Sequence, residues 1–315
     1  MKIEKISIVI PAFNEEESLV PLLIEINNLF KKLQYQYEVI VIDDGSCDST
    51  WDVILDFSRN SSGNIKGVRL IKNYGQTAAI QVGFKESCGD VIIVMDADGQ
   101  NDPNDIGYLI AEIEKGYDIV SGWRHQRKDF FLRVIMSWMG NFLVKKISGL
   151  DLHDVGCSLK AYRKEYIKDV KLLGEMHRIL LIYLAERGAR VKELKVNHRK
   201  RINGKSKYGM GRVVKLVMDL ILYKFFTKFA SKPIYMFGGL GFFSILFSFL
   251  LGLFVIYRKI AFHGAWISPL FFISVTFLTV GIIFIMLGIL AELLVRIYYQ
   301  TQYELPYQVK EKVNS

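Results

Sequence analysis

The sequence predicts an α/β domain built on a mostly parallel sheet, followed by two membrane-spanning helices. Short runs rich in Val and Ile alternate with helix-like stretches between residues 6 and 121, a pattern typical of a parallel sheet covered on both faces. Long uncharged runs follow only after residue 236. A hydrophobic content of 51% excludes a disordered chain, and a net charge of +9 with a mean hydropathy of +0.22 is unusual for a soluble enzyme.

The alternation assigns the elements of the first domain in order. Strands are expected at 6–10, 39–42, 68–71, 91–95 and 119–121, and helices at 16–33, 49–59, 77–87 and 103–115. No charged-then-apolar leader precedes the first strand, so no signal peptide is expected. The cysteines, Cys47, Cys88 and Cys157, are too few and odd in number for a disulfide framework, and we expect reduced thiols.

Two runs near the C-terminus are long enough to cross a bilayer. Residues 237–256 and 269–291 carry no charge, and each reaches the roughly 20 residues that a spanning helix needs. Core helices of a soluble protein are the alternative, but they are rarely wholly apolar over such a length. Lys and Arg gather before the first run, whereas the loop at 257–268 carries only two. The positive-inside rule therefore predicts a multi-pass protein of the cytoplasmic (inner) membrane, with the α/β domain facing the cytoplasm.

Two further segments are amphipathic. Residues 130–147 and 213–230 interleave Lys and Arg with large apolar side chains at helical spacing, which is typical of helices lying among lipid headgroups; core-facing helices are the alternative. Aromatic residues of the tail fit either an interfacial belt or a subunit contact in a homo-oligomer. The predicted organisation is a cytosolic domain at 1–211 with an interface helix at about 130–147, a juxtamembrane amphipathic helix at 212–232, two transmembrane helices at 233–291 and a cytoplasmic tail at 292–315.

Polar residues follow the predicted strands where the strands end. Ligands of such sheets bind at these carboxyl ends, so we expect the clusters after strands one, two and four to converge. Asp96 and Asp98 are two residues apart in an extended segment and can share one hard cation, with Gln100 as a third oxygen ligand. We interpret this as a site for Mg²⁺ or Mn²⁺ that leaves positions open for diphosphate oxygens; a simple turn is the alternative.

A basic stretch lies between the sheet and the membrane segments. Residues 195–207 contain six Lys or Arg and no acidic residue. This composition fits either a solvated surface or a binding site for phosphates. Its position just before a predicted membrane-surface helix favours the phosphates of a lipid carrier and a nucleotide, and no nucleic acid partner is expected.

Several motifs together resemble a known enzyme family. PAFNEE at 11–16, VIDDGSCDST at 41–50, NYGQ at 73–76 and MDADGQ at 95–100 resemble inverting family 2 glycosyltransferases, which have a Rossmann-like sheet of the glycosyltransferase A type. DVGCSLKAYRK at 154–164, GKSKYG at 204–209 and the two C-terminal spans are similar to the polyprenyl-phosphate glycosyltransferases, such as dolichyl-phosphate mannose synthase, bactoprenol glucosyl transferase and undecaprenyl-phosphate aminoarabinose transferase. The resemblance covers nearly the whole chain.

The resemblance implies transfer of a sugar from a nucleotide-sugar donor to polyprenyl (undecaprenyl) phosphate in the bilayer. A UDP-hexose is the first expectation for the donor and GDP-mannose the next, with an aminoarabinose donor as an alternative. Asp154 would act beside Asp96 and Asp98 as a base or as an orienter of sugar hydroxyls; a turn cap is its structural alternative. The implied nucleotide-sugar contacts are Pro11, Phe13, Glu15, Asp43, Asp44, Gln76 and Asp96; the metal ligands are Asp96, Asp98 and Gln100; the contacts of donor and acceptor phosphates are Arg124, Arg133, Ser137, Arg201, Ser206 and Lys207.

Other functions explain the sequence less well. A processive polysaccharide synthase would carry a Q-x-x-R-W string, which this sequence lacks, and usually more spans. A non-catalytic membrane scaffold would have no need of the Asp96, Asp98 and Gln100 pattern. Glu175 and His177, in the GEMHR string at 174–178, are candidates to lie near Asp154 in space, but a His beside an apolar helix is more often structural, so no chemistry is assigned to them.

Overall fold

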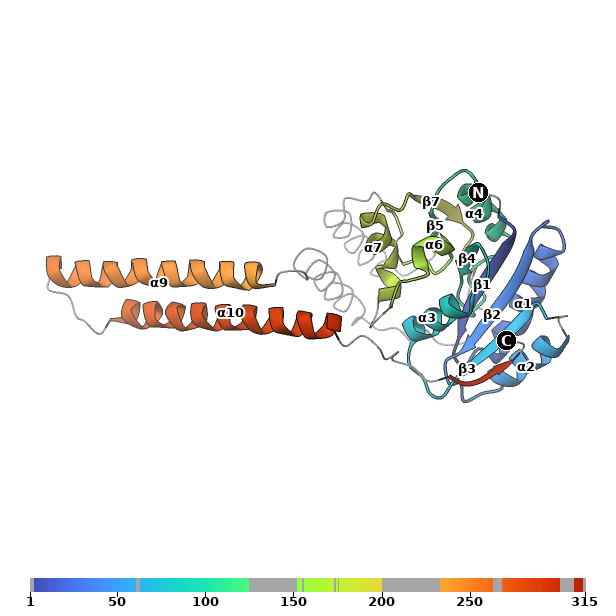
Figure 1. The fold of residues 1–315 in the computed structure, drawn as a ribbon, viewed down its shortest axis with the longest axis horizontal. Coiled ribbons are helices and arrows are strands. Elements are labelled where there is room, and N and C mark those ends of the chain that lie inside the picture. Colours follow the sequence, from blue (N-terminus) through green and yellow to red (C-terminus); the bar gives the residue numbers. More distant parts are fainter. Residues whose placement is uncertain are drawn as a thin grey trace. The chain divides into compact units, whose positions relative to one another are not determined.

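The computed structural model describes residues 3–60, 63–124, 152–154, 156–172, 174, 176–199, 233–262, 268–300 and 309–313. The chain divides into two compact units (Figure 1). One comprises residues 1–220 and 305–315, and the other comprises residues 221–304. The first unit contains the predicted α/β domain and the second contains the two apolar helices.

The first unit is organised around one sheet. Its strand order is β7-β5-β6-β4-β1-β2-β3-β8. Parallel pairs join β1 to β2 and β4, β2 to β3, and β5 to β7, whereas β6 and β8 run antiparallel to their neighbours. The sheet is therefore mixed, because β6 and β8 run in the opposite direction to the other strands. The strands are β1 (Lys5–Ala12), β2 (Gln36–Asp43), β3 (Ile65–Leu70), β4 (Val91–Val94), β5 (Ile119–Arg124), β6 (Lys160–Arg163), β7 (Val191–Val196) and β8 (Val309–Val313).

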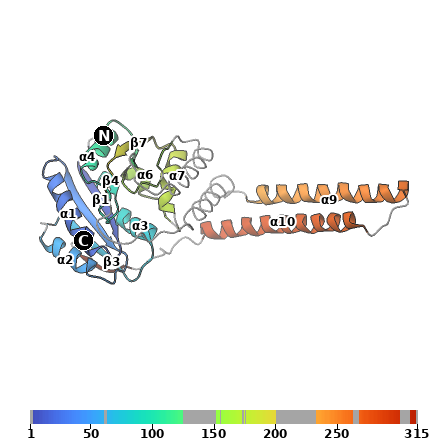
Figure 2. The same ribbon diagram turned by 180° about the vertical axis from the view of Figure 1, so that it is seen from behind.

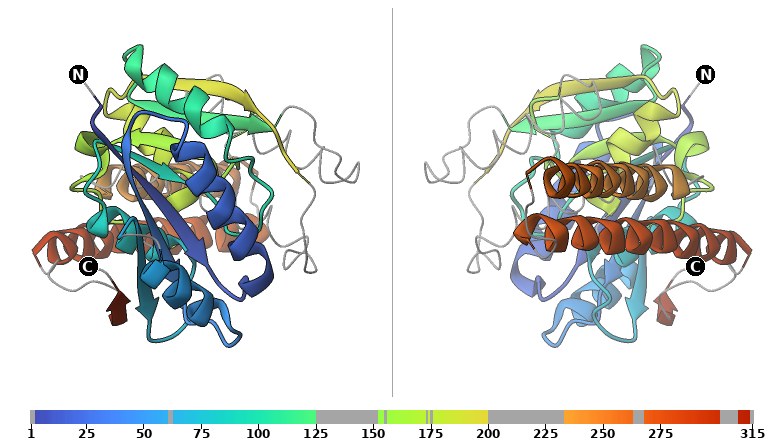
Figure 3. Two further views of the ribbon diagram at one scale, coloured as in Figure 1. Left: turned by 90° about the vertical axis from the view of Figure 1, so that its right-hand side faces the viewer. Right: turned by 90° about the vertical axis from the view of Figure 1, so that its left-hand side faces the viewer.

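Helices cover the sheet on both faces (Figure 3). Side chains of α1, α2 and α4 pack in one core with Ile6, Ile8 and Ile10 of β1. On the other face α3 approaches so closely that a Cβ at Gly83 would clash with Val9 and contact Ile42, so glycine is required there. The helices are α1 (Glu16–Phe30), α2 (Thr50–Asn60), α3 (Gln76–Glu86), α4 (Asp105–Glu114), α6 (Lys164–Ile167), the 3₁₀ helix η1 (Met176–Arg178) and α7 (Leu180–Glu186).

The first five strands and four helices follow the predicted order, with boundaries shifted by a few residues. Their strands are buried Val and Ile runs, which periodicity detects well. The edge strands β7 and β8 escape such detection, because their sequences VKELKV and VKEKV mix Lys and Glu with the apolar residues. Charged side chains are common on edge strands, where they oppose pairing with other chains. The strand β8 belongs to the predicted tail and pairs antiparallel with β3.

The second unit is a pair of long helices, α9 (Ile234–Phe262) and α10 (Pro269–Gln300), which run side by side (Figure 2). By length and composition, 234–261 and 269–295 are each sufficient to cross a membrane, and most of their large apolar side chains are exposed. The predicted loop at 257–268 begins too early, because α9 continues through Arg258 and Lys259, which are good helix formers.

Small residues bring the two helices together. A Cβ at Gly241 would lie 2.7 Å from the carbonyl oxygen of Gly281, so the backbones are in close contact there. Further along, Ser248 Oγ donates a hydrogen bond to the carbonyl of Ser274 at 2.7 Å, and Ser274 Oγ donates to the carbonyl of Ser248 at 2.9 Å. Small residues and reciprocal hydroxyl bonds are typical of helix packing in lipid.

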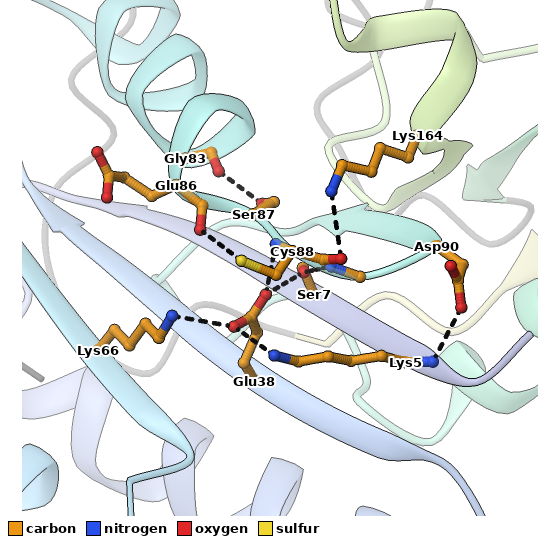
Figure 4. A network of polar contacts seen from close by, with 11 residues as sticks. Lys5, Ser7, Glu38, Lys66, Gly83, Glu86, Ser87, Cys88, Asp90 and Lys164 are labelled. Atoms are coloured by element: carbon orange, nitrogen blue, oxygen red, sulfur yellow. Dashed lines mark hydrogen bonds and ion pairs between the residues drawn. The ribbon is translucent and has the colours of Figure 1, made fainter. Parts of the chain in front are cut away.

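A buried ionic cluster lies where β1 and β2 begin, at the opposite edge of the sheet from the predicted site (Figure 4). Glu38 is 2% exposed and accepts hydrogen bonds from Ser7 Oγ and from the backbone N–H of Cys88. Its Oε2 lies 3.0 Å from Lys5 Nζ and 3.2 Å from Lys66 Nζ. Burial alone would raise the pKa of Glu38, but these donors and cations outweigh burial and lower the pKa to about 2.

Replacement of Glu38 by Gln is expected to destabilise the protein at neutral pH and to flatten its response to acid. A carboxyl whose folded pKa is depressed stabilises the fold above its unfolded pKa, and this contribution is lost as the pH falls through the folded value. For Glu38 the loss falls between about pH 4.5 and 2 and amounts to roughly 3 kcal/mol. Thermal unfolding of the full-length chain in detergent, followed from about pH 7 to about pH 2, measures it. Asp52→Asn, on the exposed side of α2, is the matched control; equal behaviour of the two variants would contradict the prediction.

Candidate functional site

The carboxyl ends of β2, β1 and β4 lie side by side, because these strands are parallel neighbours. The predicted donor-site residues are on or directly after them. Pro11 lies within β1, opposite Ile42 of β2, and Asp43 is the last residue of β2. Asp96 follows the end of β4 by two residues. The sheet therefore brings the three predicted polar clusters to one edge.

Hydrogen bonds between the loops after β1 and β2 hold the predicted nucleotide-sugar contacts at this edge. Asn14, with a φ of 54°, donates its backbone N–H to Ser46 Oγ at 2.9 Å and accepts from the N–H of Cys47 through its side chain at 2.9 Å. Asn is one of the few residues that adopt this backbone conformation readily. Phe13 is half-buried beside it. Glu15 is half-buried and accepts a hydrogen bond from Ser18 Oγ at 2.7 Å.

The two adjacent aspartates at the end of β2 have different surroundings. Asp43 is fully buried, with Oδ1 accepting from the N–H of Ser46 at 2.8 Å and Oδ2 lying 3.1 Å from Arg69 Nε. Asp44 accepts from the N–H groups of Tyr74 at 2.7 Å and Gly75 at 2.8 Å. Burial raises the pKa of Asp44 despite these two bonds, which lower it. Asp44 thus anchors the loop that leads into α3 and positions Gln76.

The Asp96 to Gln100 loop is held from both sides. Gln76 Nε2 donates to Asp96 Oδ1 at 2.8 Å, and the N–H of Gln100 donates to Asp98 Oδ1 at 3.1 Å. The carbonyl of Gln100 accepts from the N–H of Arg199 at 2.8 Å, and its side-chain Nε2 lies 3.4 Å from His198 Nε2. Both contacts come from the segment that follows β7. These hydrogen bonds hold the loop between α3 and the segment after β7.

The oxygen atoms that this loop offers as metal ligands fit a hard divalent cation. Two carboxylates and one amide supply oxygen ligands of the kind that Mg²⁺ and Mn²⁺ prefer. Within the described ranges, no group of three His, Cys, Asp or Glu side chains comes together in a metal-binding arrangement. An ion held by Asp96, Asp98 and Gln100 would keep coordination positions open for other oxygen ligands.

Arg124 and Asp154 form a bidentate ion pair at the end of β5. Arg124 Nε donates to Asp154 Oδ2 at 2.7 Å and Nη2 donates to Oδ1 at 2.8 Å, while the backbone N–H of Arg124 reaches Oδ2 at 3.2 Å. The side chains are 12% and 6% exposed. Burial would lower the pKa of Arg124, but the hydrogen bonds and charge of Asp154 outweigh burial and raise the pKa. Arg124, a predicted phosphate contact, and Asp154, predicted as a base or as an orienter of sugar hydroxyls, therefore form one pair.

Glu193 of β7 holds the turn that carries Asp154. Its Oε1 accepts from the N–H of Asp154 at 3.0 Å, and its Oε2 accepts from the N–H of His153 at 2.7 Å. The His153 ring stacks on Trp123 with centroids 4.2 Å apart. Because Trp123 precedes Arg124 and His153 precedes Asp154, stacking and ion pairing join the same two segments.

Replacement of Glu193 by Ala is expected to lower turnover at the site by about tenfold, because a misplaced Asp154 no longer fixes the Arg124 guanidinium. Loss of the two hydrogen bonds from the N–H groups of exposed His153 and buried Asp154 is also expected to cost about 1–3 kcal/mol of unfolding free energy. Steady-state kinetics and thermal unfolding measure both effects. Glu186→Ala, an exposed position at the end of α7, is the control, and equal turnover in the two variants would count against this role for Glu193.

The family comparison agrees with this geometry. The model of glycosyl transferase family 2 matches residues 7–171, which contain the strand-end clusters and the Arg124–Asp154 pair. The chain is a family 2 glycosyltransferase.

Relatives of this glycosyltransferase match it over almost its whole length. Dodecaprenyl-phosphate galacturonate synthase of Rhizobium johnstonii is 38% identical, over 98% of this chain and 92% of the relative. Undecaprenyl-phosphate 4-deoxy-4-formamido-L-arabinose transferase of Shewanella sediminis is 36% identical, over 98% of this chain and 92% of the relative.

A solved structure shares the fold of the α/β domain. Glucosyl-3-phosphoglycerate synthase from Mycobacterium tuberculosis, crystallised with Mn²⁺ and UDP-glucose, has a TM-score of 0.55 at 18% identity, over 70% of this chain and 79% of that one.

Several predicted positions of the glycosyltransferase lie outside the described residues. The interface helix at 130–147, the helix at 212–232 and Glu175 are among them. His177 is described and lies with its Nδ1 at 2.6 Å from Thr77 Oγ1, next to Gln76. The predicted phosphate contacts outside the described residues are Arg133, Ser137, Arg201, Ser206 and Lys207.

Three residues that contact or neighbour the predicted site of the glycosyltransferase are not predicted from the sequence. Glu193 and His198 lie on or after β7, a strand that periodicity does not detect. Lys160 opens β6, where a Lys in a strand of mixed character is easily taken as exposed. Its signal in the sequence is its place between two apolar residues, Leu159 and Ala161.

Proposed function

We propose that this glycosyltransferase transfers a sugar from a nucleotide diphosphate donor to the phosphate of a polyprenol, with inversion at the anomeric carbon. The observation that carries the proposal is the pairing of two charged sites at one sheet edge: the Asp96–Asp98 loop and the Arg124–Asp154 pair. Both belong to a chain that also carries two helices apolar enough to cross a membrane. The relatives named above, which act on dodecaprenyl or undecaprenyl phosphate, support the same substrate class.

Residues of the first, second and fourth strand ends would bind the donor. Pro11, Phe13, Glu15 and Asp43 would border the base and ribose, while Asp44 and Gln76 would position the Asp96 loop. Asp96, Asp98 and Gln100 would hold Mg²⁺ or Mn²⁺, which when bound neutralises charge on the leaving diphosphate. The hydrogen bonds from Gln76 to Asp96 and from Gln100 to Asp98 would help to orient these carboxylates for the ion.

Arg124 would bind phosphate on the acceptor side, and Asp154 would position Arg124. Asp154 engages Nε and Nη2 of Arg124, so a phosphate oxygen would contact Nη1. A phosphate monoester has its second pKa near 6 and is largely dianionic at neutral pH, so it attacks without a strong base. A carboxylate whose two oxygens already accept from a guanidinium is also a poor proton acceptor. Arg133, Ser137, Arg201, Ser206 and Lys207 are proposed to complete the phosphate contacts.

The membrane topology is part of the proposal. The helices α9 and α10 would form a two-pass hairpin, with its short connection on the outer side. The strand β8, which follows α10, pairs with β3 of the sheet, and this supports a return of the chain to the side of the α/β domain. The excess of Lys and Arg before α9 supports the cytoplasm as that side.

A lipid-extraction assay tests the proposed function. Full-length protein in detergent, Mn²⁺ and undecaprenyl phosphate are incubated with radiolabelled nucleotide sugars. The panel includes UDP-glucose, UDP-N-acetylglucosamine and GDP-mannose, together with nucleotide-linked galacturonate and 4-deoxy-4-formamido-L-arabinose, the sugars named in the relatives. We expect one donor to give label that partitions into organic solvent and depends on the lipid phosphate. Label that remains in water with every donor would overturn the proposal, and a growing water-soluble polymer would indicate a polysaccharide synthase.

A further inference from the structure

His177 lies in the GEMHR string at 174–178, to which the proposed mechanism gives no role. It is the middle residue of the 3₁₀ helix η1 and is half-buried. Its Nδ1 lies 2.6 Å from the hydroxyl oxygen Oγ1 of Thr77, which is 6% exposed. A hydroxyl can donate or accept, so this hydrogen bond forms with either tautomer of the ring. The bond ties η1 to the beginning of α3.

Thr77 is directly beside a residue that contacts the proposed metal loop. It is the second residue of α3, and Gln76 is the first. The side chain of Gln76 donates a hydrogen bond from Nε2 to Asp96 Oδ1 at 2.8 Å. Such a bond weakens steeply when the donor moves out of line or out of reach. The position of the first turn of α3 therefore decides how well the amide of Gln76 holds the Asp96 carboxylate.

The chain is held on both sides of Gln76 by side chains from other parts of the domain. Asp44, just after β2, accepts from the N–H groups of Tyr74 at 2.7 Å and Gly75 at 2.8 Å. Gly75 has a φ of 93°, a conformation that residues with a side chain rarely adopt. Asp44 thus holds the residues before Gln76, and His177 holds the residue after it.

A second contact between the same two segments lies further from the site. Gln81, five residues further along α3 than Gln76, accepts from the N–H of Leu172 through Oε1 at 2.5 Å. Leu172 is 2% exposed and comes four residues before η1. Both bonds attach this segment to α3, but only the bond of His177 is made at the end that carries Gln76. The two contacts therefore allow a role in attaching the segment to be separated from a role in placing Gln76.

We propose that His177 is a positioning residue for the metal loop. Through Thr77 it fixes the first turn of α3, and thereby the hydrogen bond by which Gln76 orients the Asp96 carboxylate toward the cation. The inference rests on the proposed function for the presence of a cation at Asp96. Replacing a residue that hydrogen-bonds a metal ligand typically costs about 10- to 100-fold in metal affinity or activity. Because His177 acts through α3, we expect the lower end of this range, about tenfold.

Mn²⁺ binding to the full-length protein in detergent, followed by electron paramagnetic resonance, tests the inference. His177→Ala is expected to weaken binding about tenfold, and so is Thr77→Val, which replaces the hydroxyl by a methyl group. His177→Asn is expected to restore binding, because its amide can donate or accept close to the position of Nδ1. Asp98→Ala gives the background of weaker sites. Gln81→Leu is the matched control: it is expected to unfold at a lower temperature but to bind Mn²⁺ like wild type.

A double-mutant cycle shows whether the effect passes through Gln76. Gln76→Ala removes the hydrogen bond to Asp96, so adding His177→Ala to it is expected to weaken Mn²⁺ binding little further. A residue that only stabilises the fold would have the same effect on Mn²⁺ binding with and without Gln76. Full additivity of the two losses would therefore overturn the inference.

The outcomes separate this inference from the proposed function, because Mn²⁺ binding requires neither donor nor acceptor. Wild type that binds Mn²⁺ through Asp98 but makes no lipid product would refute the proposed function and leave the comparison of His177 variants readable. Unchanged Mn²⁺ affinity in Thr77→Val or in folded His177→Ala would overturn the inference, as would equal weakening in Gln81→Leu. So would Mn²⁺ binding by wild type that does not depend on Asp98. If His177→Ala does not fold, Thr77→Val decides alone.

Discussion

Asp98→Ala is expected to abolish sugar transfer while leaving the fold intact. Asp98 is 6% exposed and accepts a hydrogen bond from the backbone N–H of Gln100 at 3.1 Å. Loss of that bond costs only about 1 kcal/mol. Loss of a metal ligand removes the charge that stabilises the leaving diphosphate, and we expect kcat/KM to fall by about a thousandfold or more. The extraction assay at saturating Mn²⁺, with thermal unfolding in parallel, measures both effects.

Asp102→Ala is the matched control for this prediction. Asp102 lies four residues further along and forms an ion pair with Arg199 at 2.9 Å, on the outer side of the same loop. Its replacement is expected to cost stability but to retain most of the transfer activity. Near-normal transfer by Asp98→Ala would mean that the cation is held elsewhere.

Asp154→Asn and Arg124→Lys are expected to lower transfer by similar factors, each about a hundredfold, and to act as one unit. Asparagine offers Arg124 only one acceptor oxygen, and lysine cannot form the two parallel bonds of a guanidinium. Because each change breaks the same pair, the double variant is expected to be little worse than the more impaired single variant.

A double-mutant cycle separates this account from a base role for Asp154. If Asp154 removed a proton from the acceptor, Asp154→Asn would be far more damaging than Arg124→Lys, and the two losses would multiply. Lys168→Met, at an exposed position after α6, controls for general effects of altered charge. A pH profile of the same variants shows whether a titrating group has been lost.

The sequence predicts the elements whose pattern is local. Buried runs such as Ile6 to Ile10 have the composition of parallel strands, and the helices between them show their own period. The two apolar helices follow from length and composition in the same way. The loop predicted at 257–268 begins too early because a helix does not end where hydrophobicity ends, and α9 continues through Arg258 and Lys259 to Phe262.

What the sequence does not predict depends on contacts between distant residues. Arg124 and Asp154 are each candidates by motif, but their pairing across thirty residues appears only in three dimensions. Glu193 lies on β7, whose sequence VKELKV mixes charged and apolar residues and is not detected as a strand by periodicity. The position of Lys160 depends on β6, which pairs antiparallel with both β4 and β5. Pairing order is set by the whole sheet, and no short window of sequence contains it.

The bond formed in the lipid product tests the central claim most directly. The claim is that a phosphate oxygen of the polyprenol attacks the anomeric carbon in line, at a site that holds donor and acceptor phosphates on opposite sides of the sugar. ³¹P and ¹H NMR of the purified product report both the phosphodiester link and the anomeric configuration. We predict a sugar joined through its anomeric carbon to the lipid phosphate, with a configuration opposite to that of the donor. A retained configuration, or a phosphate that is still a monoester, would contradict the account.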